Sequence, residues 1–466
     1  MLPTVLVRCL FFIQSVYCCV AFFSRRVDGF RVYKAGIPKL VTRSHADYNW
    51  DVSHDNELFG VAESRGDVSG NRNNLRKPGI LTHMSPGIST VLPIGKRIVN
   101  RIERVIHVEM SRIGAKEVEL PMLLSSDTIN ERRNEFGREL FSLTDRNGKH
   151  YDLCPTCEEL ICRMLDKALS PLSKRNLPIY LYQIGRKFRD EARPCNSNMR
   201  CREFIMKDAY SFHSDKDSAA MDYNKFKQAY ERIFTLLELS FDTVTIGDTE
   251  HEFRAMLPNK KTLMEIAHIF QLGDAITTEA GLKYEGEGRM KHPVYLNSYG
   301  IGIHRLLQAA ASQHADSEGI RLPQIIAPYD VAVIPCDENS EQASADIYTL
   351  LSKRGIDTFL DTRKAPINQR VSDMMNIGIP HIVYVSSVYT EKAMSCPNED
   401  ITMKIIEGSK KSNYYHQYQS PTYSLLQDKE IPDTIQRINV GYSHRSFPGE
   451  YTIPVSKLLQ LLAVAR

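Results

Sequence analysis

The chain has 466 residues, of which 42% are hydrophobic and 25% are charged. This length predicts two to four domains with a substantial core, and the composition is that of an ordinary soluble protein. The formal net charge is only +3 at pH 7, so composition alone does not indicate a nucleic-acid partner. Any RNA contact must come from local basic patches, whose contacts with phosphates weaken as salt rises.

The N-terminal segment differs from the rest of the chain and is interpreted as a leader. Cys9–Phe23 is almost wholly apolar and, at about 15 residues, is too short to span a bilayer comfortably. Ser24–Arg43 follows and carries six basic residues against one acid, Asp28. A basic segment behind a signal-like one resembles the two-part leader of proteins sent through the secretory system to a plastid such as the apicoplast, and a mitochondrial presequence is the alternative. Residues 1–70 are therefore left out of the fold prediction.

Ten cysteines raise the question of disulfides. Three of them, Cys9, Cys18 and Cys19, lie in the leader. The other seven are odd in number and irregularly spaced in a long chain, which favours reduced thiols over a disulfide framework. They are Cys154, Cys157, Cys162, Cys195, Cys201, Cys336 and Cys396.

The first predicted elements after the leader are a helix and a strand. Apolar residues recur at helical spacing from Ile98 to Ile113, which predicts an amphipathic helix. Gly114 suits its C-terminal end, because glycine adopts a left-handed conformation easily. Glu117–Leu120 is predicted to be a strand that runs into Pro121. Taken alone, a helix followed by an edge strand is weak evidence of function.

Residues 182–213 are the most informative part of the sequence. Two apolar runs that favour strands flank a polar loop, Ala192–Cys201, which predicts a long antiparallel hairpin. The first strand delivers Arg189 and Glu191, and the returning strand delivers Phe204. An arginine, a carboxylate and an aromatic ring on adjoining strands can together hold a phosphate, an adenine amine and an adenine face.

The rest of the chain predicts more helices and strands. A helix is expected around Tyr223–Leu239, and a glycine-rich turn, Gly300–Gly302, opens a second apolar helix. After Pro328, strands and helices alternate, which implies a compact α/β unit with a partly parallel sheet. The tail after Ser386 is irregular and polar until a terminal apolar helix. The expected elements of this last part are Val331–Ile334, Gln342–Leu351, Ile356–Leu360, His381–Val385 and Val455–Val464.

The hairpin resembles motif 2 of the class II aminoacyl-tRNA synthetases, and its amino-acid sequence is similar to that of the bacterial or organellar prolyl-tRNA synthetases. The helix and strand before Pro121 resemble motif 1, and Gly300–Arg305 resembles motif 3. The resemblance covers roughly residues 75–385. It implies an α+β protein, in which a six- or seven-stranded antiparallel sheet with flanking helices is followed by a smaller α/β anticodon-binding domain. It also implies a homodimer formed through motif 1. We expect the leader at 1–70, the catalytic domain at 71–322 and the anticodon-binding domain at 323–466.

The resemblance assigns residues to an ATP site. Making an aminoacyl adenylate needs no side-chain nucleophile, because positioning and charge neutralisation are sufficient. By the family's pattern, Arg189 bridges the substrate carboxylate and the α-phosphate, while Arg305 contacts the γ-phosphate. Glu191 accepts from the adenine amine, Phe204 stacks on adenine and Gln271 lies near ATP. Mg²⁺ is expected to accompany the nucleotide.

Two further stretches indicate proline as the amino acid. Leu153–Glu159 resembles the prolyl enzymes' Pro-Thr-His-Glu-Glu, so Thr156 and Glu158 would meet the substrate's ring and its secondary ammonium. Glu265–Gly273 resembles their Glu-x-Gly-His-Ile-Phe-Gln-Leu-Gly, which places His268 beside the proline. The chain departs from the family's pattern at three positions. Cys157 stands in place of histidine, Ala267 in place of glycine and His304 in place of a small hydroxyl residue.

Cys154 and Cys157 also form a Cys-x-x-Cys pair, which can bind zinc or take part in redox chemistry. Threonyl-tRNA synthetases hold a zinc through a comparable stretch, but their next histidine ligand would fall at Tyr210, and a phenol is a poor substitute. No second Cys-x-x-Cys completes a site of four ligands. We therefore predict no metal bound by the protein alone.

RNA contacts are predicted at two places. Arg193 and Arg200 lie in the motif 2 loop, where they could meet the tRNA acceptor end. In the anticodon-binding part, Arg363, Lys364 and Arg370 could contact phosphates or bases of a single-stranded loop. The segment from Asp208 to Glu265 is too short for both the usual connector and the editing domain that bacterial prolyl enzymes commonly insert there, so no editing domain is expected.

The sequence is therefore interpreted as an organellar proline--tRNA ligase, with ATP, proline and tRNA(Pro) as partners. One alternative is a non-catalytic paralogue that acts as a tRNA-binding or regulatory protein, and another is threonyl-type specificity. Retention of the whole predicted ATP set argues against the paralogue, because a protein that only binds tRNA does not need it.

Overall fold

The computed structural model describes residues 79–128, 137–195, 200–247, 249–258, 263–316, 319–387, 439–444 and 447–464. The predicted leader and Cys396 lie outside these ranges. Within them, no helix is both long and apolar enough to cross a membrane.

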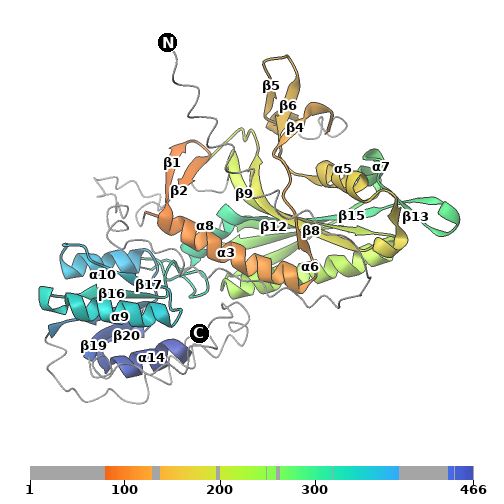
Figure 1. Cartoon of the computed structure of the whole chain (residues 1–466). Coiled ribbons are helices and arrows are strands. Elements are labelled where there is room, and N and C mark those ends of the chain that lie inside the picture. Colours follow the sequence, from red (N-terminus) through yellow and green to blue (C-terminus); the bar gives the residue numbers. More distant parts are fainter. Residues whose placement is uncertain are drawn as a thin grey trace, which may run out of the picture. The chain divides into compact units, whose positions relative to one another are not determined.

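A seven-stranded sheet forms the centre of the N-terminal part (Figure 1). Its strands are hydrogen-bonded in the order β10-β11-β12-β15-β9-β8-β3. Neighbouring strands are antiparallel except at the edge, where β3 runs parallel to β8. The expected antiparallel sheet is thus confirmed. In the order of the sheet, the strands are Phe241–Ile246, Glu250–Met256, Leu263–Gly273, Tyr295–Gly302, Glu203–His213, Ile179–Phe188 and Lys116–Glu117.

The predicted hairpin is confirmed as β8 and β9, which pair from Ile179 opposite Phe212 to Phe188 opposite Glu203. Side chains alternate along both strands, so that every second residue lies on one face of the sheet. Tyr182 and Ala209 belong to the core on one face, whereas Leu181 and Tyr210 belong to a second core on the other. This division decides which hairpin residues can meet a substrate.

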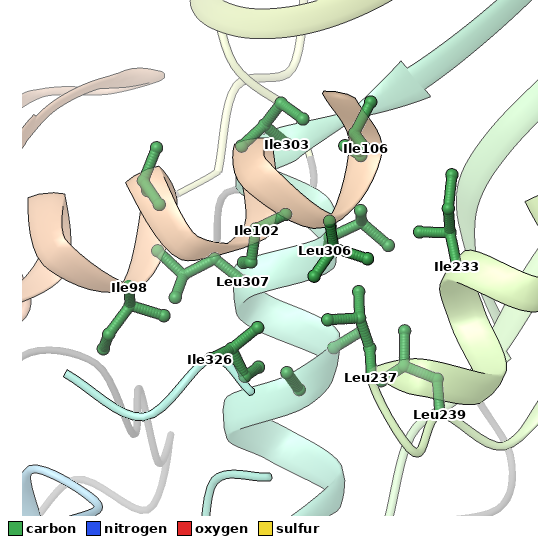
Figure 2. Close-up of a cluster of buried hydrophobic side chains, with 14 of the residues drawn as sticks. Ile98, Ile102, Ile106, Ile233, Leu237, Leu239, Ile303, Leu306, Leu307 and Ile326 are labelled. Atoms are coloured by element: carbon green, nitrogen blue, oxygen red, sulfur yellow. The ribbon is translucent and has the colours of Figure 1, made fainter. Parts of the chain in front are cut away.

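Three helices cover the first face: α3 (Pro93–Arg112), α6 (Lys216–Leu236) and α8 (Ile303–Gln313) (Figure 1). Helix α3 has a proline in its first turn, and it is followed by Gly114 at φ +85°. Its buried isoleucines pack against leucines of α8, as Figure 2 shows for Ile102 and Leu306. The predicted amphipathic helix is confirmed. The strand expected at Glu117–Leu120 was placed too late, since only Lys116–Glu117 pairs with the sheet.

Smaller elements lie outside the main sheet. Helix α5 (Glu158–Leu169) and helix α7 (Ala275–Glu279) contribute to the second core, which also contains the buried Cys154, Cys157 and Cys162. The short strands form three separate sheets: β1 Leu81–Ser85 with β2 Ile88–Val91; β4 Leu123–Ser125, β6 His150–Leu153 and β5 Ser142–Thr144; and β14 Lys291–Pro293, β13 Lys283–Glu285 and β7 Leu172–Ser173. Single 3₁₀ turns occur at Ser126–Thr128, Gly137–Glu139, Lys174–Asn176, Glu287–Arg289 and Glu338–Ser340.

The C-terminal part contains a five-stranded sheet in the order β17-β16-β18-β19-β20. The parallel pairing of β16 with β17 and β18 confirms the predicted α/β unit. Its strands are Thr358–Leu360, Val331–Pro335, His381–Val385, Asn439–His444 and Phe447–Pro454, and its helices are α9 Glu341–Lys353, α10 Ile367–Asn376 and α14 Val455–Val464.

Two features of this part were not predicted. Strands β19 and β20 extend the sheet in antiparallel sense within a tail that was expected to be irregular. Gly441, Pro448 and Gly449 resemble turn residues and obscure the strand pattern. Helix α10 begins directly after Pro366, and its polar first turn gave little apolar periodicity to detect.

Candidate active site

A pocket of about 440 Å³ opens on the face of the sheet opposite α3, α6 and α8. It brings together residues that are far apart in the sequence, from the start of α5, the hairpin, β12, β15 and the start of α8. Its lining consists of Glu139, Pro155, Thr156, Glu158, Arg189, Glu191, Arg200, Cys201, Phe204, Met206, Asp208, Glu265, Ile266, Ala267, His268, Phe270, Leu272, Ser298, Gly300, Gly302, His304 and Arg305.

Sheet register explains why these residues meet. Gly300 pairs with both Asp208 of β9 and His268 of β12, so the three strands present one continuous floor. Glycine has no side chain and therefore leaves space above this part of the sheet. A β-carbon at Gly302 would lie 3.3 Å from Cδ of Arg305, which is tighter than most real contacts, so glycine leaves room for this arginine.

Two guanidinium groups, from Arg189 and Arg305, line the pocket. The Nε and Nη2 atoms of Arg189 each donate to the carbonyl oxygen of Pro155 at 3.4 Å, and the guanidinium lies 5.4 Å from the centre of the Phe204 ring. Burial and then the positive charge of Arg305 lower the pKa of Arg189. Two arginines that line one pocket and repel each other make a site for an anion.

The partner of Arg305 in this structure is Glu265. Nη1 of Arg305 donates to both the backbone oxygen and the carboxylate of Glu265, each at 3.1 Å. Burial alone would raise the pKa of Glu265, but hydrogen bonding by His268 and the charge of Arg305 lower it to about 2. Glu265 is therefore an anion at neutral pH. No sequence pattern predicts this pairing, because it joins strand β12 to helix α8, far along the chain.

His268 lies in the pocket as predicted, and acidic residues surround it. Its Nε2 is 3.3 Å from Oε2 of Glu250, while its Nδ1 is 3.5 Å from Oε1 of Glu265 and 3.9 Å from Oε1 of Glu252. The ring stacks on Phe270 with 3.9 Å between centroids. These contacts fix the orientation of the imidazole before any substrate arrives.

Glu158 and Thr156 also line the pocket, and their side chains contact each other. The hydroxyl of Thr156 donates to Oε2 of Glu158, and the hydroxyl of Ser298 donates to Oε1 at 3.0 Å. Only 8% of Glu158 is exposed, and it is the first residue of α5, where the helix dipole favours a negative charge. Ser298 was missed by the sequence reading, although it lies two residues before Gly300 and hence on the same face of β15.

The three departures from the family's pattern take defined positions. Ala267 is in β12 and lacks a positive φ, so its methyl group strains no turn. Cys157 is fully buried with its Sγ 2.8 Å from that of Cys154, and this contact together with burial raises its pKa. His304 lines the pocket and is 6% exposed, and burial beside Arg186 and Lys96 lowers its pKa to about 4.

No metal site is evident in the described part of the chain. There, no three histidine, cysteine or acidic side chains are grouped so that they could hold an ion. Tyr210, which stands at the position of the threonyl enzymes' ligand, instead uses its hydroxyl to donate to Oδ2 of Asp208 at 2.8 Å and to accept from the amide of Cys157 at 3.2 Å.

Two predicted residues of the catalytic part lie outside the pocket lining. Gln271 follows Phe270 on β12, so its side chain points to the opposite face of the sheet. Its backbone N–H donates to the backbone carbonyl of Thr249. This arrangement does not support its predicted contact with ATP. Arg193 is exposed beside the pocket, where its amide donates to Oε1 of Glu191 at 3.0 Å. Arg200 is also exposed and does line the pocket.

The two arginines predicted to contact tRNA in the C-terminal part are engaged within it. Arg363 forms ion pairs with Asp361 at 2.9 Å and Asp373 at 2.7 Å. Arg370 is 6% exposed and donates to the carbonyl oxygens of Asp361 and Pro335. These contacts give both arginines a structural role and disfavour the predicted contact with RNA, whereas the neighbouring Lys364 is exposed.

Comparisons with known proteins match both parts of the chain. Residues 141–314 match the family described as the tRNA synthetase class II core domain (G, H, P, S and T), and residues 330–389 match the anticodon binding domain. A probable mitochondrial proline--tRNA ligase of Schizosaccharomyces pombe is 30% identical over 389 residues, which cover 72% of this chain and 91% of that protein. The chain belongs to the prolyl-tRNA synthetase family. A proline--tRNA ligase of Zymomonas mobilis is 31% identical, and the match covers 68% of this chain and 87% of the relative.

Solved structures share the synthetase's fold. The prolyl-tRNA synthetase of Cryptosporidium parvum, solved with halofuginone and AMPPNP, has a TM-score of 0.66 at 18% identity and matches 84% of this chain and 74% of its own. That of Giardia lamblia, solved with prolyl-adenylate, has a TM-score of 0.65 at 18% identity and matches 84% and 78%. The predicted class II core followed by an anticodon-binding domain is confirmed.

Proposed function

We propose that this synthetase converts proline and ATP into prolyl-adenylate and pyrophosphate, and then transfers the prolyl group to the 3′ end of tRNA(Pro). A carboxylate oxygen of proline attacks the α-phosphorus, and the bond to pyrophosphate breaks. A ribose hydroxyl of the tRNA then attacks the carbonyl carbon and AMP leaves. The observation that carries this proposal is one pocket lined by two guanidinium groups, from Arg189 and Arg305, and by the hydrogen-bonded carboxylate of Glu158.

Glu158 is the proposed partner of the substrate's secondary ammonium. Its oxygens are oriented by Thr156 and Ser298, so the carboxylate needs little reorganisation when a cation arrives. The apolar part of the proline ring would pack against Thr156 and His268. Cys157 stays behind this surface, because its thiol is fully buried.

Arg189 and Arg305 are the proposed partners of the reacting groups. A planar fork of donors suits carboxylate and phosphate oxygens alike, so Arg189 can bridge the two reactants and neutralise charge as the new bond forms. Arg305 would bind the terminal phosphate once it releases Glu265. Phe204 offers a face for adenine, and Glu191 offers an acceptor for its amine. Gln271 is not part of this proposed set, because it lies on the other face of the sheet.

Mg²⁺ is proposed to bind together with ATP. Mg²⁺ prefers oxygen ligands and is commonly held by one or two carboxylates plus substrate phosphates. Glu265 fits this description, since it is an anion that lines the pocket beside the proposed phosphate site. The ion would supply neutralisation of phosphate charge, while Glu265 would hold it in place.

The tRNA is proposed to reach the pocket past Arg193 and Arg200, which are both exposed. In the C-terminal part, Lys364 is the better candidate for an RNA contact than Arg363 or Arg370. We retain the domain boundaries 71–322 and 323–466 and the homodimer through the α3 region as parts of this proposal.

The lack of cis-editing is also proposed. Between Asp208 and Glu265, the described residues form the end of β9, then α6, β10, β11 and the start of β12, and these belong to the catalytic sheet and its helices. If the purified protein transferred alanine to tRNA and then rapidly hydrolysed the product, this proposal would be overturned.

An organelle is the proposed site of action. The signal-like and basic segments favour a plastid, and the mitochondrial description of the Schizosaccharomyces pombe relative supports the alternative. Fusion of residues 1–78 to a fluorescent protein would distinguish the two organelles by microscopy, and a uniformly distributed signal would contradict both.

Proline-dependent exchange of pyrophosphate into ATP tests the central proposal. We expect exchange with proline and none with threonine. Exchange with threonine alone would indicate threonyl specificity, and no exchange with any amino acid would indicate a non-catalytic paralogue.

A further inference from the structure

A buried ion pair joins a residue of the pocket lining, Asp208, to Lys187. Nζ of Lys187 is 3.2 Å from Oδ1 of Asp208, and the two side chains are 0% and 3% exposed. Asp208 lines the pocket but Lys187 does not. Lys187 thus contacts the Asp208 carboxylate from within the protein, whereas a substrate would approach the same carboxylate from the pocket.

Asp208 is tied to the loop before α5 by hydrogen bonds. Its Oδ2 accepts from the Tyr210 hydroxyl at 2.8 Å and from Nε2 of Gln183 at 3.1 Å. The Tyr210 oxygen in turn accepts from the backbone amide of Cys157 at 3.2 Å. Burial and the charge of Asp208 raise the pKa of Tyr210 well above its usual value, so its hydroxyl keeps the proton that it donates.

The connection matters because Cys157 stands between Thr156 and Glu158. A shift of its amide moves both of the side chains that are proposed to meet proline. Tyr210 is therefore the link that transmits the position of Asp208 to the ammonium site. Gln183 connects Asp208 to Cys157 a second time, because its Nε2 also donates to Sγ of Cys157 at 3.2 Å.

Of the two lysines near Asp208, only Lys187 can balance its charge. Lys207 precedes Asp208 in the sequence but points to the helix face, where its Nζ donates to the Tyr230 hydroxyl at 2.6 Å, and burial lowers its pKa far below the usual value. Burial would also lower the pKa of Lys187, but attraction to Asp208 raises it overall. Lys187 is the charged partner.

We propose that Lys187, Asp208 and Tyr210 are positioning residues for proline: Lys187 neutralises Asp208, and Tyr210 transmits its fixed position to Thr156 and Glu158. A buried ion pair seldom adds much stability, whereas removal of one partner leaves an uncompensated charge. The network is thus better suited to fixing geometry than to holding the fold together. This inference rests on the proposed function of the pocket.

Tyr210→Phe tests the link, because it removes the hydroxyl and keeps the ring. In pyrophosphate exchange with the full chain, we expect KM for proline to rise about tenfold, as for a lost hydrogen bond to a charged group, while KM for ATP stays within twofold. Tyr182→Phe is the matched control. Tyr182 is a buried tyrosine on the opposite face of β8, with one hydrogen bond to His107, and it does not line the pocket.

Charge balance is tested by rescue. Lys187→Met alone should raise KM for proline at least tenfold, because it leaves the Asp208 carboxylate buried without its cation. Adding Asp208→Asn to that variant removes the stranded charge and keeps an acceptor for Tyr210, so KM for proline should return to within about threefold of the wild-type value. Thermal unfolding of each variant identifies a loss of structure.

The outcomes separate this inference from the proposed function. If the wild-type protein shows no proline-dependent exchange, the proposed function fails. If it does exchange, the inference is overturned when Tyr210→Phe leaves KM for proline unchanged or raises KM for ATP equally, or when the double variant is no better than Lys187→Met. Should Lys187→Met not fold, the double variant and Tyr210→Phe still decide the matter.

Discussion

Replacement of Arg189 by alanine should have a larger effect on adenylate formation than most single changes in the pocket. Within the described part of the chain, its guanidinium makes two long hydrogen bonds, of 3.4 Å, to the Pro155 carbonyl. Both N–H groups can therefore leave the Pro155 carbonyl and donate to a better acceptor, such as a phosphate or carboxylate oxygen. Repulsion from Arg305, which contributes to the lowered pKa of Arg189, would also be relieved by an anion between the two groups.

The expected magnitude follows from this geometry. At about 4 Å and an effective dielectric constant of about 20, a unit charge pair attracts by about 4 kcal/mol. Since each 1.4 kcal/mol is about a factor of ten in rate, Arg189→Ala should lower kcat/KM for proline-dependent exchange about 10³-fold. This agrees with losses of about 10²–10³ when one donor to a developing oxyanion is removed.

Pyrophosphate exchange at saturating ATP, with proline varied, measures the effect. Arg189→Lys should recover part of the activity, because it restores the charge but not the planar fork. Arg186→Ala is the control, since this arginine lies on β8, three residues before Arg189, with its side chain 58% exposed, and it should change kcat/KM by less than twofold. An Arg189→Ala protein that is folded and keeps more than a tenth of the activity would refute the proposed role.

Three other predictions concern stability and tRNA. Because burial lowers the pKa of His304 to about 4, the folded state binds fewer protons than the unfolded state between about pH 6.5 and 4, so stability should fall by roughly 3 kcal/mol as pH drops through that range. In urea unfolding, His304→Asn should remove that part of the pH dependence and the exposed His150→Asn should not; equal slopes for all three proteins would contradict this. Ile102→Ala should cost about 2–5 kcal/mol, because Ile102 is fully buried between helices, whereas Met221→Ala, at a 72% exposed position, should cost less than about 0.5 kcal/mol. Arg193→Ala should raise KM for tRNA severalfold at low salt and by a smaller factor at higher salt, where the phosphate contact is already weak. It should leave pyrophosphate exchange unchanged, so a loss of exchange would place this arginine in the pocket instead.

Much of the fold could be predicted because its signals are local. The spacing of Ile98, Ile102 and Ile106 already specifies one face of α3, and the polar loop after Glu191 separates two strand-like runs. Such patterns depend on residues a few positions apart, so they survive without knowledge of the partner element. Strand β19 lacked such a signal, because Gly441 interrupts it and its pairing partner is β18, far away in the sequence.

The candidate site was predicted less completely than the fold. Arg189, Phe204 and Glu158 were found through motifs, but the pairings of Glu265 with Arg305 and of Ser298 with Glu158 join strands to distant helices, and no short-range pattern encodes them. Motif matching also says nothing about which face a strand residue occupies. That is why Gln271 was expected near ATP, and why Arg363 and Arg370 were expected at a surface rather than in the ion pairs and carbonyl contacts that hold them.

The alternation of side chains along β8 restricts how this synthetase can vary. Gln183, Lys187 and Arg189 lie at odd positions of one run and all face the pocket side of the sheet, so a single inserted or deleted residue between Gln183 and Lys187 would turn the following side chains toward α6. The loop between β8 and β9 has no such restriction, because its length does not alter the register of either strand. Relatives should therefore differ in the length of that loop and not in the length of the strands. In a library of single-residue insertions across residues 179–213, activity should be kept only for insertions between Ala192 and Cys201.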